Sequence, residues 1–175
     1  MPVEAVHFVQ EPFAESSEYS EVQAIASKLL QHLNEPDVIA QITEVNVPGA
    51  SSALVQNTFL DQARSLGFRD ESKGLFAGYV NKGLRPDYFL QTRESGIILE
   101  VERGKTTINN MDFLDFWKCH LCEHANYLFL MVPTSLVQNG KMKPRNEFQT
   151  VTNHLAPFFE ERNYTNVRGL TIFGY

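Results

Sequence analysis

Cysteine, tryptophan and long apolar runs are scarce in this sequence. Its 175 residues include one tryptophan and two cysteines, Cys119 and Cys122, which lie three positions apart. Two thiols this close together do not make the disulfide framework of a small secreted domain. No stretch approaches the roughly 18 consecutive apolar residues of a membrane-spanning helix, and the first residues lack a basic region followed by an apolar run. We therefore expect a soluble, cytoplasmic protein with no membrane partner.

Basic residues are also few, since 15 lysines and arginines face 21 aspartates and glutamates for a formal net charge of −6. Such a balance gives no general attraction for nucleic acid, which would have to bind through local groups of cations. Internal repeats, low-complexity tracts and proline- or glycine-rich linkers are absent. With 43% hydrophobic residues, a chain of this length can bury one substantial core. We expect a single domain over residues 1–175.

The spacing of the apolar residues predicts an α/β protein. The predicted helices cover residues 16–34, 51–66, 109–124 and 146–162. The predicted strands cover residues 74–80, 86–91, 96–103, 127–133 and 167–173. Residues 38–47 are rich in β-branched side chains and bounded by prolines, which leaves a strand or an extended connection open. The strand at 127–133 is continuously apolar, so we expect it at the centre of the sheet.

The second and third of these predicted strands carry three carboxylates, Asp87, Glu100 and Glu102. Successive side chains of a strand point to opposite faces, so Glu100 and Glu102 share a face. If residues 93–96 form the turn, Phe89 pairs with Glu100 and Asp87 pairs with Glu102. All three acids then lie on one face of a hairpin. A slip of one residue in the pairing would separate them.

These acids and the order of the predicted elements resemble the PD-(D/E)XK superfamily of restriction-endonuclease-like nucleases. Asp87 and the proline before it look like the PD half of the signature. Glu100 and Glu102 look like the (D/E)XK half, with glutamate in place of lysine, as in the ExE arrangement of the BamHI type. The resemblance covers roughly residues 51–133 and implies an αβββαβ core with a central mixed sheet flanked by helices. It implies a metal-dependent endonuclease acting on DNA, of a restriction or mobile-element kind. The alternative is an inactive nuclease-fold protein that binds DNA or assembles with other proteins.

Three neighbouring carboxylates need a cation, since two charges near 4 Å repel by about 4 kcal/mol at an effective dielectric of about 20. Mg²⁺ prefers carboxylate and water oxygens and can activate a water beside a phosphate, so we expect Mg²⁺, with Mn²⁺ as a substitute. The expected ligands are Asp87, Glu100 and the carbonyl of Val101, with Glu102 as a base or second ligand. Gln56, on the preceding helix, either binds a metal-bound water or is merely solvated. The alternative is an exposed acidic sheet face paired with lysine or arginine.

Basic residues flank the acids and are candidates for contact with a phosphate backbone, which they would position without reading sequence. The candidates are Lys82, Arg85, Arg103, Lys105, Lys141, Lys143 and Arg145. Lys118 either approaches the phosphate or is an exposed helix lysine, which is the more common case. Cleavage of both strands of a duplex favours a homodimer, although a larger complex and an RNA or single-stranded substrate stay open.

Two cysteines and two histidines between residues 119 and 124 raise the question of zinc. One helix cannot wrap four ligands around a tetrahedral ion, so the spacing disfavours such a site. A half-site completed by His32 or His154 remains open. Trp117 and Phe113 are expected to pack in the core rather than to stack on bases.

Overall fold

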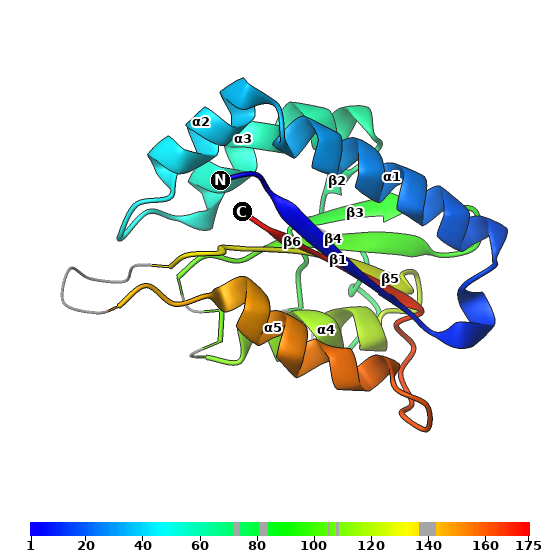
Figure 1. Cartoon of the computed structure of the whole chain (residues 1–175). Helices are drawn as coiled ribbons and strands as arrows, with labels where there is room; N and C mark the ends of the chain where they lie inside the picture. The colour runs from blue at the N-terminus through cyan, green and yellow to red at the C-terminus, as the bar shows by residue number, and fades with distance from the viewer. Residues whose placement is uncertain (72–73, 81–83, 105, 108, 137–142) are drawn as a thin grey trace.

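The computed structural model of the protein describes residues 1–71, 74–80, 84–104, 106–107, 109–136 and 143–175. A mixed six-stranded sheet separates two layers of helices (Figure 1). One face is covered by α1 (Ser17–Leu33), α2 (Pro36–Val45) and α3 (Ser52–Ser65), and the other by α4 (Met111–Leu121) and α5 (Glu147–Leu155). The predicted fold class, an α/β protein with a central mixed sheet flanked by helices, is confirmed. No helix in the described ranges is both long and apolar enough to cross a bilayer.

The strands lie in the order β1-β6-β5-β4-β3-β2. Their bounds are β1 (Glu4–Val9), β2 (Arg69–Asp70), β3 (Tyr88–Gln91), β4 (Gly96–Val101), β5 (Tyr127–Val132) and β6 (Gly169–Gly174). Two short 3₁₀ helices, η1 (Glu11–Phe13) and η2 (Ala156–Phe159), complete the described elements. β4, β5 and β6 are parallel to one another, and the other pairs are antiparallel. β5 is an inner strand with every residue buried, as its apolar sequence predicts.

The order α3, β2, β3, β4, α4, β5 reproduces the predicted helix, three strands, helix and strand. The first of the three strands was placed wrongly, because it is β2 and not residues 74–80. That segment forms turns, with the amide of Ala77 bonded to the carbonyl of Gly74 at 3.2 Å. Leu75 and Phe76 are buried there against the core on the α4 side. Their apolar character therefore reflects the covering of a core and not a strand.

Residues 38–47, expected to be extended, are mostly part of helix α2. Pro36 begins this helix, because its fixed φ and missing N–H suit the first turn. Val38 and Ile42, four residues apart, form the buried side of α2. Pro36 does mark the start of a new element, but the apolar residues after it have the spacing of a helix and not of a strand.

The remaining differences concern the ends of elements and one missed strand. β1 was not predicted, because its residues are partly exposed and show no clear alternation of apolar and polar side chains. The last predicted helix stops at Leu155, since Pro157 lies in a 3₁₀ turn that ends it. Helix α4 ends at Leu121. Asn110, which precedes its first residue, has a left-handed conformation (φ 53°), and its side chain does not cap the helix.

The turn between β3 and β4 is held in place by α1. Glu18 is buried, and its Oε1 accepts hydrogen bonds from the Thr92 hydroxyl at 2.6 Å and the Ser95 amide at 2.8 Å. Its other oxygen pairs with Arg168 at 3.0 Å. The hairpin turn is therefore tied to a helix of one layer and, through Arg168, to the chain leading into β6.

The hairpin pairs Gln91 with Gly96, and its turn is residues 92–95 instead of 93–96. The predicted pairs are wrong by two positions, since Phe89 lies opposite Ile98 and not opposite Glu100. A shift of two residues leaves each side chain on its predicted face, because the side-chain period of a strand is two. The acids therefore keep a common face despite the wrong pairing.

Gly96 begins β4 at a point where no side chain fits. A Cβ atom there would lie 2.7 Å from Cζ of Phe89 and 2.8 Å from the carbonyl oxygen of His124. We expect Gly96→Ala to lower the free energy of unfolding by about 1–3 kcal/mol, the usual effect of overpacking a core. Urea denaturation measures the change. Gly78→Ala is the matched control, because nothing lies within 4 Å of its added Cβ. Equal stability of the two variants would contradict the prediction.

Candidate active site

Asp87 and Glu100 meet where β3 begins and β4 ends. Oε2 of Glu100 accepts a hydrogen bond from the amide of Asp87 at 3.1 Å. Oδ2 of Asp87 accepts one from the amide of Val101 at 2.9 Å. Each carboxylate is thus bonded to the backbone of the opposite strand. The two acids that the sequence placed on one face are brought together.

Helix α4 adds two charged side chains to these acids. Nζ of Lys118 lies 2.9 Å from Oε1 of Glu100 and 2.8 Å from Oδ1 of Asp115. Lys118 is 8% exposed and Asp115 is 0% exposed. The expectation that Lys118 is an exposed helix lysine is therefore wrong.

Asp115 was missed by reasoning from the sequence, although a signal for it was present. It shares the buried side of α4 with Phe116 and Cys119, at the spacing of an apolar stripe. A carboxylate in such a stripe is unusual, because a buried charge needs a partner. Together with Lys118 three positions later, Asp115 could have been recognised as part of a buried polar group.

Glu102 follows β4 and completes the group that we call the acid cluster: Asp87, Glu100, Glu102 and Asp115. Burial raises the pKa of Glu102 to about 8, and the Asp115 carboxylate adds to the rise. The backbone of Glu102 is fixed on both sides. Its amide donates to the carbonyl of Met131 at 2.9 Å, and its carbonyl accepts from the hydroxyl of Tyr175 at 2.8 Å.

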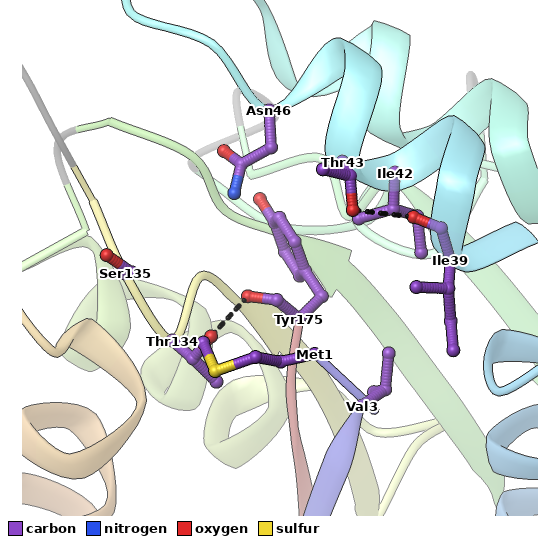
Figure 2. Close-up of a pocket in the computed structure, with 9 residues that line it drawn as sticks. All are labelled: Met1, Val3, Ile39, Ile42, Thr43, Asn46, Thr134, Ser135 and Tyr175. Atoms are coloured by element: carbon purple, nitrogen blue, oxygen red, sulfur yellow. Dashed lines mark hydrogen bonds between the residues drawn. The ribbon is translucent and has the colours of Figure 1, made fainter.

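Tyr175 connects the acid cluster with a separate small cavity of about 180 Å³. Figure 2 shows its ring directed toward Asn46, and the hydroxyl of Thr134 donates to the backbone oxygen of Tyr175 at 3.0 Å. The cavity lies between α2 and the ends of β1 and β6, and none of the four acids lines it. The cavity is therefore linked to the acid cluster only through Tyr175, whose hydroxyl is bonded to the backbone of Glu102.

The electrostatics of the acid cluster follow from burial and crowding. Burial raises the pKa of Asp87, Glu100 and Asp115, although Lys118 opposes the rise in each case. Burial by itself would lower the pKa of Lys118, but the carboxylates of Asp115 and Glu100 outweigh it and raise that pKa. The ammonium is thus held charged among carboxyl groups that it only partly neutralises.

The donor chemistry of the acid cluster fits a hard divalent cation. Its carboxylate oxygens are the ligands that Mg²⁺ prefers. Within the described ranges, however, no three or more histidine, cysteine, aspartate or glutamate residues are arranged to hold a metal. The donor atoms suit Mg²⁺, but the ammonium of Lys118 lies between Glu100 and Asp115.

Gln56 reaches the site from α3, on the other side of the sheet from α4. Its Nε2 donates to Oδ2 of Asp87 at 3.0 Å, and its Oε1 accepts from the hydroxyl of Tyr88 at 2.9 Å. The side chain is thus fixed beside Asp87 and is not simply solvated.

Two of the cations predicted to contact phosphate are engaged in contacts within the protein. Arg103 donates to the carbonyls of Val47 and Ala50, which ties the segment between α2 and α3 to the end of β4. Arg145 forms an ion pair with Glu147 at 2.9 Å. Each has a structural role that the sequence did not predict.

The other predicted phosphate contacts divide into two groups. Arg85 and Lys143 are exposed, and Arg85 lies two residues before Asp87. Lys82, Lys105 and Lys141 lie outside the described residues. Among the described candidates, Arg85 is therefore the exposed cation closest in sequence to the acid cluster.

Of the residues considered for zinc, the two cysteines are buried thiols and three histidines contact other side chains. Cys119 and Cys122 are buried and free. His120 bonds the hydroxyl of Thr165, His154 bonds buried Asp112 at 2.7 Å, and His32 lies 3.3 Å from Glu35.

Trp117 is 57% exposed on the outer side of α4, so the expectation that it packs in the core is wrong. Leu114 and Leu121, also exposed, lie three residues before it and four after it. This spacing makes one apolar stripe on the side of α4 opposite its buried residues Phe116 and Cys119. The helix thus has a charged inner contact with the acid cluster and an apolar outer surface.

Comparison with known proteins gives fold-level similarity only. No protein-family model and no curated protein matches the sequence. Among solved structures, the chain is similar to restriction endonuclease BglII bound to a 16-mer DNA, with a TM-score of 0.43 and 10% identity over 99% of this chain and 78% of that one. It is also similar to free BglII, with a TM-score of 0.40 and 7% identity over 99% and 79% of the two chains. At these scores, the similarity assigns no activity to the chain.

Proposed function

We propose that this protein is a divalent-metal-dependent endonuclease that hydrolyses phosphodiester bonds of DNA. The observation that carries the proposal is the convergence of Asp87, Glu100, Glu102 and Asp115 at one end of a hairpin. Asp87 and Glu100 are joined through the hydrogen bond at 3.1 Å, and Lys118 joins Glu100 to the fully buried Asp115. Four carboxyl groups at such close range repel one another when ionised, and a cation among them or the uptake of protons relieves the repulsion.

Residues of both hairpin strands and of α3 would have roles in this chemistry. A bound Mg²⁺ would supply an activated water and polarise the scissile phosphate. Asp87, Glu100 and the carbonyl of Val101 would hold the ion, with the amides of Asp87 and Val101 fixing the two carboxylates. With the cation beside it, Glu102 would be ionised and would accept the proton of the attacking water at a carboxylate oxygen. Gln56 would keep Asp87 oriented through its hydrogen bond at 3.0 Å.

The surroundings of the acid cluster support a nucleic-acid substrate and a homodimer. Arg85, exposed just before Asp87, would contact a backbone phosphate and position the strand without reading its sequence. Cleavage of both strands of a duplex needs two sites related by a two-fold axis, which a homodimer provides. The exposed Leu114, Trp117 and Leu121 on α4 form one apolar surface that such an association could bury.

A second candidate is a nuclease-fold protein without turnover that binds DNA or assembles with partners. The observation that favours it is that no group of three or more histidine, cysteine, aspartate or glutamate residues within the described ranges is arranged to hold a metal. The formal charge of −6 and the glutamate at position 102 point the same way.

The two candidate functions predict different outcomes in a plasmid-cleavage assay. We expect the purified protein to convert supercoiled plasmid to nicked or linear DNA with Mg²⁺ or Mn²⁺, and to leave it intact with a chelator. Linear product at early times would support paired sites, and nicked circles alone would support a single site. Intact plasmid with both metals, over a panel of plasmids and with single-stranded DNA, would favour the binding protein.

A further inference from the structure

The ammonium group of Lys118 lies inside the acid cluster and not at the surface of α4. It is within 2.9 Å of both Glu100 and Asp115, and the residue is almost entirely buried. An ammonium ion is compact and strongly hydrated, so its burial requires carboxylates that replace the lost water. Lys118 therefore occupies a position between carboxylates that a bound cation would need.

The acid cluster keeps capacity for further positive charge. Four carboxyl groups converge there, and the single positive charge of Lys118 is paired with two of them, Glu100 and the fully buried Asp115. A divalent cation can supply further positive charge to such a group of carboxylates.

We propose that Lys118 is a built-in counter-ion of the acid cluster, which competes with the divalent cation for Glu100. Both cations need the carboxylate of Glu100, and like charges at such short range repel. Lys118 would hold the site together without metal, and metal binding would release its ammonium from Glu100. The inference rests on the proposed metal-dependent function and adds to it a control on how metal is loaded.

Lys118→Met tests the competition by direct binding of Mn²⁺ to the full chain without DNA, measured by isothermal titration calorimetry. We expect the dissociation constant to fall at least about tenfold, because the repelling charge is gone. Without metal the variant should melt at a lower temperature, and Mn²⁺ should raise its Tm more than that of the wild type. Lys28→Met, which removes an exposed lysine of α1, is the matched control and should change neither quantity. Equal or weaker Mn²⁺ binding by Lys118→Met would overturn the inference.

A second measurement uses the wild-type protein, in case the variant does not fold. Lys118 should react slowly with an amine-directed reagent without metal, because it is buried and ion-paired. Saturating Mn²⁺ should increase its labelling, measured by mass spectrometry, while labelling of Lys28 stays constant. Unchanged or slower labelling of Lys118 with Mn²⁺ would show that metal does not displace the ammonium, and the inference would fail.

These results separate the inference from the proposed function. Tighter Mn²⁺ binding by Lys118→Met, with no cleavage of any DNA by the wild type, would support the counter-ion and refute the nuclease. Equal Mn²⁺ binding by both proteins, with cleavage by the wild type, would refute the counter-ion and leave the nuclease standing.

Discussion

Asp87→Asn is expected to abolish metal-dependent cleavage of plasmid DNA while leaving the fold intact. Oδ1 of the asparagine can still accept the hydrogen bonds that Val101 and Gln56 now donate to Oδ2 of Asp87. The negative charge that would hold the cation is lost. Charge stabilisation by a metal is worth several kcal/mol in the transition state, so we expect the rate to fall at least about a hundredfold. The rate of loss of supercoiled plasmid measures it.

Asp70→Asn is the matched control for this prediction. Asp70 lies on β2, next to β3, and its carboxylate pairs with Arg64 on the surface at 3.0 Å. The same chemical change, made outside the acid cluster, should leave the cleavage rate unchanged. If Asp87→Asn cleaves like the wild type with an unchanged Tm, Asp87 holds no essential metal. If both variants lose activity, the loss does not come from the site.

The common face of the hairpin acids could be predicted because it depends on little more than the two-residue period of a strand. Glu100 and Glu102 share a face in any register, and Asp87 joins them in any register shifted by an even number. The pairing itself could not be predicted, since it depends on Glu18, which binds the turn from a distant helix. A contact between residues 18 and 95 leaves no trace in local sequence.

The errors on α4 have a similar cause, because contacts with residues distant in the sequence decide which side chains of a helix are buried. α4 was predicted from its spacing, but the direction of its polar residues depends on which side meets the sheet. Lys118 looks like an ordinary helix surface residue until Glu100 lies beside it. Trp117 shows the converse case, because an aromatic residue typical of a core is exposed. Burial on a helix is decided by packing partners, which sequence periodicity locates only approximately.

Glu18→Ala is expected to produce the largest loss of stability of the changes considered. The buried carboxylate accepts bonds from Thr92 and Ser95 and pairs with Arg168. Alanine would leave the donors of the hairpin turn and a half-buried guanidinium without their acceptor. Removing one partner of a buried ion pair lowers the free energy of unfolding by about 3–5 kcal/mol. Urea denaturation checks the value, and Glu15→Ala, which removes an exposed carboxylate just before α1, should change it little.

The same carboxylate makes the stability of the protein depend on acid. Burial alone would raise the pKa of Glu18, but hydrogen bonds from Thr92 and Ser95 outweigh it and lower the pKa below its ordinary value of 4.5. A group with a lowered pKa in the folded state stabilises the protein fully above its unfolded value, and this contribution is lost as pH falls through the folded value. The wild type should therefore lose stability below about pH 4.5, while Glu18→Gln, which cannot ionise, should lack this part of the loss. Parallel acid-induced falls in Tm for the two proteins would show that the turn does not depend on the charge of Glu18. A smaller fall in Glu18→Gln would instead show that the ionised carboxylate of Glu18, bonded to the turn, stabilises the hairpin that carries Asp87 and Glu100.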